Sequence, residues 1–446
     1  MQRDPATGLL TEVRSGAGTT ELVTTYEYNP FGELSSMRTE RNTTPAPTLV
    51  YEVVYERDVL GRVAFKTETT AGGVESWAYA YDLEGRLEEV AYGTGQSCEG
   101  ATPACSPIEA YGYDANGNRT HEGSSLGTLS SIGTYDHRDR IVTYDGESYV
   151  YDDNGMLKQK GSGGGATHYD YDLFGSLRKV TLPSGATITY TIDGLGRRVG
   201  RTYDDGIDPP ESRYWVYRDQ LNPVAELDAA GNITKRFIYA GGAFVPSFMI
   251  AGGVTYKFVT DQLGSVRMVV RLDDGSIAQE IDYDAWGLAT LLTGTWDDQP
   301  FGFAGGFYDP ATGLYRFGAR DYDPEIGRWT AQDPILFRGG QPNLYEYAKG
   351  DAINRIDPNG ALVEAPCGGL LGDRVIAWLN SQAQWAYRFA GEAYEDDNWA
   401  GTVAFGAMGA LAEAAPAAAE IATTLGGSSS LEARPASEGP RSPYLV

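Results

Sequence analysis

The chain has 446 residues, of which 41% are hydrophobic, and a formal net charge of -26 at pH 7. A polyanion is repelled by phosphate backbones, so we expect no nucleic-acid partner. The 30 tyrosines and 57 glycines favour strands joined by tight turns, because tyrosine prefers extended backbone and glycine accepts positive φ. The composition therefore predicts an all-β chain.

The N-terminal residues MQRDPATGLLTEV lack the basic and apolar segments of a signal peptide. They are more typical of the middle of a repeat, in which Asp-Pro-Ala-Thr-Gly forms a turn. The absence of a targeting signal here therefore says little about a longer parent chain.

A word of the form Tyr-x-Tyr-Asp-x-x-Gly recurs along the chain. The two rings of one word lie two residues apart and share one face of a strand. The aspartate opens a turn and the glycine closes it, so each word predicts a β-hairpin with an aromatic face. The clear copies are residues 79–87, 111–117, 149–155 and 169–175, and weaker copies are 26–34, 55–63, 135–141, 190–198, 258–266 and 283–287.

The copies do not have a fixed period. The turn positions Gly117, Asp139, Gly155, Gly175 and Gly196 lie 16 to 22 residues apart. Propeller blades keep one period, so this spacing argues against a propeller. It favours a long sheet of paired hairpins with loops of variable length, in which neighbouring tyrosines stack across strands.

Cysteine and histidine give few site candidates. Cys98 and Cys105 flank a short loop and form either a disulfide or two free thiols, and Cys367 has no evident mate. The three histidines are isolated, and no Cys/His cluster has metal-ligand spacing. We therefore expect neither a metal nor a cofactor.

After residue 300 the chain becomes a run of Asp-Pro turns. Asp309, Asp323 and Asp357 open Asp-Pro-x-x-Gly or Asp-Pro-x-Gly words, so we interpret them as turn-forming residues. Residues 343–345 are expected to form a strand. Asp321 and Asp333 differ from these three, because neither opens an Asp-x-x-Gly turn.

Arg320, Asp321 and Asp333 could form a catalytic site. Two carboxylates held close together share a proton, and such a pair can activate water and protonate a leaving nitrogen. A guanidinium beside them could stabilise the developing oxyanion. The structural alternative is that these are turn and salt-bridge residues, since aspartate is common in loops.

The composition changes after Gly360. Residues 370–399 have helical periodicity, and residues 400–422 are rich in glycine and alanine but interrupted by Glu413, Pro416 and Glu420. We expect a buried helical pair, with a membrane-inserting element as the alternative. The tail from Ser428 is rich in serine, proline and glutamate, which predicts disorder.

These words resemble the Rhs/YD repeats of bacterial Rhs proteins, Tc toxin C components and teneurins. On this resemblance, residues 1–282 are YD repeats, residues 283–361 are similar to the Rhs-associated core, and residues 362–446 are a variable, helical and then disordered C-terminal region. The resemblance implies a hairpin strip that curls into a partial hollow shell, capped by the core, around the chain's own C-terminal part.

The resemblance also implies a self-cleavage site. The family's Arg-Asp-Tyr-Asp-Pro word and the aspartate twelve residues later match Arg320, Asp321 and Asp333, the residues proposed for aspartyl-type autoproteolysis. Cleavage follows an Asp-Pro-x-Gly-Leu word, which places the cleavage region at Gly360, Ala361 and Leu362. This chain departs from the family at three positions, with Ala361 for leucine, Gly350 for asparagine and Ala352 for proline.

The function expected from the sequence is that of a secreted or cell-surface polymorphic-toxin-type Rhs segment that encapsulates its own C-terminal part and releases it by self-cleavage near residue 360. The expected partners are the enclosed C-terminal region, an immunity protein, or a secretion or toxin complex, with a membrane only as a target of that region. One alternative is a cell-surface adhesion protein without proteolysis, and another is a degenerate gene fragment.

Overall fold

The computed structural model describes residues 1–94, 105–240 and 244–364, and these residues are almost entirely antiparallel β-structure. In the two large sheets, strands that follow one another in the chain are neighbours in the sheet. The first sheet has 11 strands. They are β1 (Gln2–Arg3), β2 (Leu10–Ser15), β3 (Leu22–Tyr28), β4 (Leu34–Arg41), β5 (Thr48–Arg57), β6 (Val63–Thr70), β7 (Gly73–Tyr81), β8 (Leu87–Thr94), β9 (Ser106–Tyr113), β10 (Arg119–Gly123) and β11 (Ser130–Ser131).

The second sheet has 16 strands in the same sequential order. They are β12 (Gly133–Tyr135), β13 (Ile141–Tyr144), β14 (Glu147–Tyr151), β15 (Leu157–Lys160), β16 (Thr167–Tyr171), β17 (Leu177–Thr181), β18 (Thr187–Ile192), β19 (Arg198–Asp204), β20 (Glu211–Tyr217), β21 (Pro223–Leu227), β22 (Ile233–Ile238), β23 (Phe248–Ala251), β24 (Val254–Thr260), β25 (Val266–Arg271), β26 (Ile277–Tyr283) and β27 (Ala289–Thr293).

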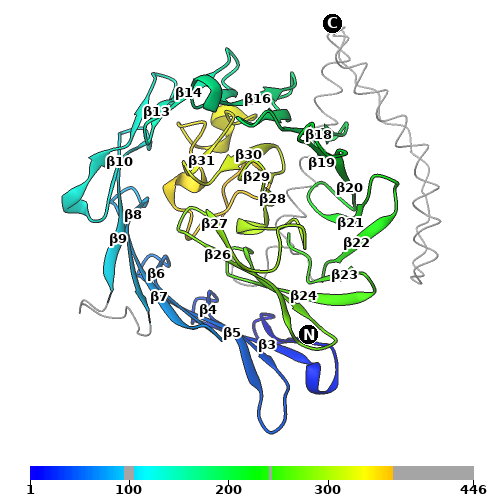
Figure 1. The fold of residues 1–446 in the computed structure, drawn as a ribbon. Coiled ribbons are helices and arrows are strands. Elements are labelled where there is room, and N and C mark those ends of the chain that lie inside the picture. Colours follow the sequence, from blue (N-terminus) through cyan, green and yellow to red (C-terminus); the bar gives the residue numbers. More distant parts are fainter. Residues whose placement is uncertain (95–104, 241–243, 365–446) are drawn as a thin grey trace, which may run out of the picture. The chain divides into compact units, whose positions relative to one another are not determined.

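A third sheet of four strands completes the described part of the chain. It consists of β28 (Phe307–Asp309), β29 (Leu314–Phe317), β30 (Arg320–Asp323) and β31 (Arg328–Trp329). Figure 1 shows the two large sheets following one another around this small sheet. We call residues 301–364 the cap.

Helix in the described residues is limited to short 3-10 segments. They are Gly18–Thr20, Leu126–Thr128, Gly163–Gly165, Phe303–Gly305, Leu336–Gly339 and Ala348–Gly350. The helices expected after residue 365 lie outside the described residues. The predicted all-β hairpin array is confirmed.

The turn chemistry of the repeats follows the prediction. In residues 79–87, the Oδ1 atom of Asp82 accepts hydrogen bonds from the amides of Glu84 and Arg86, and Gly85 closes the turn at a φ of 86°. Asp139 takes the glycine place of its own turn with a φ of 60°. Aspartate tolerates this left-handed conformation better than most residues, which is why the pattern survives there.

A tyrosine at the end of the first strand of a hairpin joins that hairpin to an earlier one. In seven hairpins its hydroxyl donates a hydrogen bond to a backbone carbonyl at the start of an earlier return strand, a bond that links hairpins without using the sheet ladder. The pairs are Tyr28–Leu10, Tyr81–Val63, Tyr113–Leu87, Tyr135–Arg119, Tyr217–Arg198, Tyr239–Pro223 and Tyr283–Val266.

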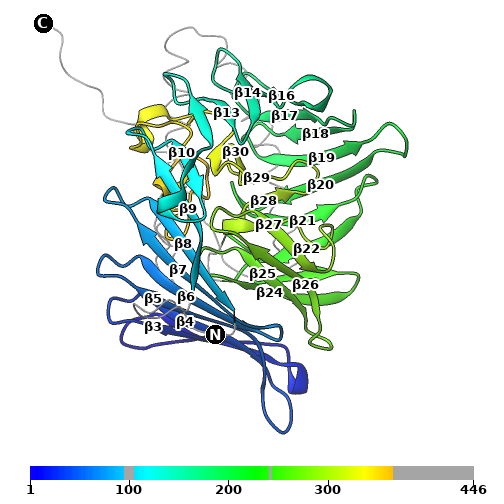
Figure 2. The ribbon, with the colours of Figure 1, turned by 60° about the vertical axis from the view of Figure 1, so that its left-hand side comes forward.

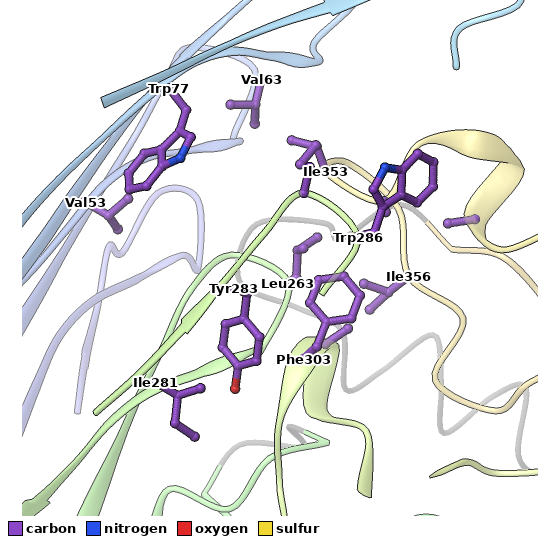
Figure 3. Close-up of a cluster of buried hydrophobic side chains, with 14 of the residues drawn as sticks. Val53, Val63, Trp77, Leu263, Ile281, Tyr283, Trp286, Phe303, Ile353 and Ile356 are labelled. Carbon is purple, nitrogen blue, oxygen red and sulfur yellow. The ribbon is translucent and has the colours of Figure 1, made fainter. Parts of the chain in front are cut away.

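The end of the second sheet packs against the first sheet, so the strip overlaps itself. A buried ion pair of 2.7 Å joins Arg267 on β25 to Glu68 on β6. Figure 2 shows β24 to β26 beside β3 to β8. In the shared core, Val53 and Trp77 of the first sheet lie with Ile281 of the second (Figure 3).

Two details of the sequence analysis are changed by the structure. Residues 343–345 do not form a strand, because the side chain of Asn343 takes the place of a strand partner: it accepts from the amide of Tyr345 and donates to Asn118 and the Asn116 carbonyl. Cys105 is disulfide-bonded, which excludes the free-thiol alternative for it. The other two cysteines lie outside the described residues.

Candidate functional site

Arg320 and Asp321 are neighbours on β30, so their side chains leave opposite faces of the strand. Both are buried, with 2% and 1% of their surface exposed. The register of β29 with β30 pairs Phe317 with Arg320 and Arg316 with Asp321. The two residues therefore belong to different clusters of side chains, although they are adjacent in the sequence.

Arg320 gathers two carboxylates and a backbone carbonyl. Its Nε atom donates to the carbonyl oxygen of Gly360 at 2.6 Å. Its Nη2 atom lies 3.1 Å from Asp357 Oδ2 and 3.2 Å from Asp333 Oδ2. The guanidinium lies over the ring of Trp329, 4.2 Å from the ring centre. The structure thus brings Arg320, Asp333 and Gly360 together, and adds Asp357.

Asp357 holds the start of the segment in which cleavage is expected. Its Oδ1 atom accepts hydrogen bonds from the amides of Ala361 at 2.9 Å and Leu362 at 3.0 Å. The side chain is fully buried. Asp357 was interpreted from the sequence as a turn former, and the structure gives it a second set of partners at Arg320. The local part of this arrangement is the pair of hydrogen bonds that Asp357 accepts from the amides four and five residues later.

Gly360 is required by close backbone contact. Its φ is 67°, and a Cβ atom there would lie 2.4 Å from the Phe317 carbonyl oxygen and 2.8 Å from the Arg320 amide nitrogen. The preceding residue, Asn359, accepts a 2.9 Å hydrogen bond from the Ala319 amide. The chain at 359–360 is therefore clamped onto the β29–β30 turn.

Asp333 and the carbonyl of Ala361 border the same glycine, Gly339. The Asp333 Oδ1 atom accepts from the Ile335 amide at 2.8 Å, so Asp333 opens a turn, as the structural alternative for this residue expected. Its Oδ2 atom and the Ala361 carbonyl oxygen lie 3.0 and 3.2 Å from the point where a Cβ atom on Gly339 would stand. A side chain at this position would therefore crowd both groups.

The two buried carboxylates at Arg320 share a single positive charge. Burial raises the pKa of Asp333 and the pKa of Asp357, and Arg320 opposes both shifts. The negative charge of Asp357 raises the pKa of Asp333 further. One guanidinium cannot neutralise two buried carboxylates, so this arrangement favours one shared proton. A proton-sharing pair can act as both acid and base.

Asp321 has other partners. Its Oδ1 atom is 2.7 Å from Arg198 Nη2, and its Oδ2 atom is 2.9 Å from Arg316 Nη1. Both oxygens are therefore engaged by guanidinium groups from β19 and β29. The structure pairs Asp333 with Asp357 through Arg320, and places Asp321 on the opposite face of β30.

Asp309 and Asp323 combine turn formation with anchoring to the shell. Each accepts a hydrogen bond from the amide two residues on, as predicted. Asp309 also pairs with Arg201 of β19 at 2.8 Å, and Asp323 pairs with Lys160 of β15 at 3.1 Å. These ion pairs hold the small sheet that carries Arg320 against the second large sheet.

In the part of the chain that the structure describes, no group of three or more His, Cys, Asp or Glu residues is arranged to hold a metal ion. No helix in it has the length and apolar character needed to cross a membrane.

Sequential hairpins with a tyrosine-rich inner face, closed by a compact cap, define a YD-repeat β-shell. The chain belongs to the Teneurin YD-shell family, whose model matches residues 10–353. It is therefore a YD-repeat, Rhs-type protein.

Individual relatives agree with this assignment. Teneurin-3 of Mus musculus is 29% identical over 323 residues, which cover 69% of this chain and 11% of the relative. The tRNA3(Ser)-specific nuclease WapA of Bacillus spizizenii is 28% identical over 262 residues, covering 56% of this chain and 11% of the nuclease. The chain thus spans about a tenth of the length of these relatives.

Solved structures share the fold. A crystal structure of TcdB2-TccC3-Cdc42 superposes with a TM-score of 0.61 over 80% of this chain and 19% of that chain, at 20% identity. A crystal structure of TcdB2-TccC3 gives the same TM-score over 79% of this chain and 20% of that chain.

Proposed function

We propose that this chain is a shell segment of a polymorphic-toxin-type Rhs protein that cuts its own backbone between Ala361 and Leu362. The observation that carries the proposal is the position of this peptide bond. The Leu362 nitrogen lies 3.0 Å from Asp357 Oδ1, and the Ala361 carbonyl oxygen and Asp333 Oδ2 both border Gly339. One carboxyl group therefore binds the nitrogen of the bond, and a second lies in the neighbourhood of its carbonyl.

The proposed reaction is hydrolysis. The ionised carboxylate, Asp357, accepts a proton from a water molecule whose oxygen adds to the Ala361 carbonyl carbon. Protonated Asp333 donates to the carbonyl oxygen as negative charge develops there. The carbon–nitrogen bond then breaks and the Leu362 nitrogen takes the proton held by Asp357. Asp333 takes its proton back from the former carbonyl oxygen, and Ala361 keeps the new carboxyl group.

Arg320 has two roles in this proposal. Its bond to the Gly360 carbonyl fixes the segment next to the carboxyl pair, and its charge keeps one carboxylate of the pair ionised. Asp321, which we expected to be the second carboxylate, is assigned a positioning role, because its ion pairs with Arg198 and Arg316 hold β30 in place.

The proposed biological role is encapsulation and release. The shell would enclose the chain's own C-terminal part, and the cut would free residues 362–446 for delivery from a secreted or cell-surface protein. The Rhs-type fold and the similarity to a tRNA-specific nuclease support this role. Gel electrophoresis under denaturing conditions tests the cut, and gel filtration tests whether the cut fragment stays with the shell.

A second candidate is an interaction module without proteolysis. The similarity to teneurin-3 favours it. The two candidates differ in one outcome, because an adhesion module remains a single full-length band after folding.

A further inference from the structure

A cavity of about 40 Å³ lies between the second large sheet and the cap, next to Pro358. Arg197, Arg198 and Arg316 contribute to its wall, together with aromatic residues such as Tyr217. Among the residues that the structure describes, none that line it is Asp or Glu. The wall therefore combines cationic and aromatic groups without a carboxylate.

The buried charges beside this cavity do not balance. Arg198 and Arg316 share the single carboxylate of Asp321. Asp309 does not supply the missing charge, because Arg201 binds both of its oxygens, at 2.8 and 2.9 Å. The three guanidinium groups of Arg198, Arg201 and Arg316 therefore face only two carboxylates, those of Asp309 and Asp321. Arginine does not give up its proton in proteins, so one buried positive charge is left over.

Unused hydrogen-bond donors accompany the excess charge. The Nε atoms of Arg198 and Arg316 are buried and make no hydrogen bond within the described part of the chain. The two residues are only 4% and 6% exposed. The Arg198 guanidinium lies 3.6 Å from the ring centre of Tyr190, so one face of it is covered. Buried charges and donors without partners are costly, and an anion would satisfy both.

We infer that this cavity, which we call the arginine pocket, binds one small monovalent anion, a halide or a carboxylate of formate size. The arginine pocket has the volume of a few water molecules, which matches such an anion and excludes larger organic ones. Arg198 and Arg316 bind it, and together with Asp321 they reach charge balance. The inference does not depend on self-cleavage.

Thermal unfolding of the full chain tests the inference. At constant ionic strength, gluconate, which is too large for the arginine pocket, is replaced stepwise by chloride or by formate. The unfolding midpoint should rise by about 2 °C for each tenfold increase in chloride above its dissociation constant. If formate raises the unfolding midpoint as chloride does, the site accepts small carboxylates. If chloride raises it and formate does not, the site accepts halides only.

Two variants give opposite expectations. Arg316→Gln removes the excess charge, so the midpoint should no longer respond to chloride. Asp321→Asn increases the excess charge, so the response should begin at lower chloride concentration. Arg197→Gln is the matched control, because Arg197 lines the same cavity but is paired with Asp193 at 2.7 Å. Its chloride response should equal that of the wild type.

Bromide soaked into crystals gives a readout that does not depend on stability. Anomalous density between Arg198 and Arg316 supports the site. Bromide found only at exposed residues, a wild-type midpoint that does not change with chloride or formate, or an unchanged response in Arg316→Gln would each overturn the inference.

Discussion

The hydroxyl of Tyr81 donates a 2.7 Å hydrogen bond to the carbonyl of Val63, in the preceding hairpin. The same hydroxyl accepts a 2.7 Å hydrogen bond from Asn354 of the cap. One side chain thus connects two hairpins and the cap, and this explains why the repeat places a tyrosine, and not a phenylalanine, directly before the aspartate.

Tyr81→Phe should therefore destabilise the shell. It takes the tyrosine hydroxyl away from the carbonyl of buried Val63 and from the side-chain amide of Asn354, which keeps its bond to Asp351. We expect a loss of about 1–3 kcal/mol in the free energy of unfolding. Tyr81→Ala, which also removes the ring, should cost about 3–5 kcal/mol. The control is Tyr214→Phe, on a ring that is 38% exposed. Equal urea midpoints for Tyr81→Phe and the control would show that the hydrogen bonds contribute nothing.

Lys257 on β24 is buried, and burial lowers its pKa to about 8. The unfolded chain therefore binds more protons than the folded chain between about pH 8 and 10.5. Stability must rise with pH across that window. Lys257→Met removes the buried charge at similar size, so it should stabilise the protein by about 2–3 kcal/mol at neutral pH and lose this advantage above pH 10.5.

Exposed Lys158→Met is the control for Lys257→Met, and its midpoint should stay close to that of the wild type. The measurement is the unfolding midpoint of each variant as a function of pH. A destabilised Lys257→Met would mean that the amine has a partner that stabilises its charge.

Glu346 behaves in the opposite direction, because burial raises its pKa to about 6. Glu346 binds its proton more tightly in the folded state than in the unfolded state. The stability gained from this protonation is complete below pH 4.5 and is lost as pH rises through about 6. Glu346→Gln should therefore be about 1–2 kcal/mol more stable than the wild type at pH values well above 6, with no gain below 4.5.

Glu147→Gln is the matched control for Glu346→Gln, because it makes the same substitution at an exposed residue. Differential scanning calorimetry at several pH values measures both variants. A gain for Glu346→Gln of the same size at every pH would assign the effect to packing and not to titration.

The sequence predicts the hairpins well because their signals are local. Asp82 and Gly85 form one turn within a few residues, and tertiary context is not needed to read them. The overlap of the two sheets is different. Glu68 and Arg267 are 199 residues apart, and nothing near either residue indicates the other, so the buried ion pair that closes the strip could not be predicted.

The sequence predicted only part of the candidate site, because the rest depends on contacts between distant segments of the chain. The alternation of β30 places Arg320 and Asp321 on opposite faces, as it does any two adjacent residues of a strand. The sequence could not tell which face would meet the chain at Gly360. That choice depends on how the turn at Asp357 packs on β29 and β30, and it decides which carboxylate accompanies Asp333.

Intact mass spectrometry of freshly folded protein tests whether Asp333 and Asp357 cut the Ala361–Leu362 bond. Wild-type protein should give two species, one that ends at Ala361 and one that begins at Leu362. Asp333→Asn and Asp357→Asn should each slow the cut by about 10²-fold or more. Asp321→Asn should cut the same bond more slowly than wild type, and Asp323→Asn should cut normally in its folded fraction. An intact wild type, or Asp357→Asn that cuts this bond at the wild-type rate, would contradict the account.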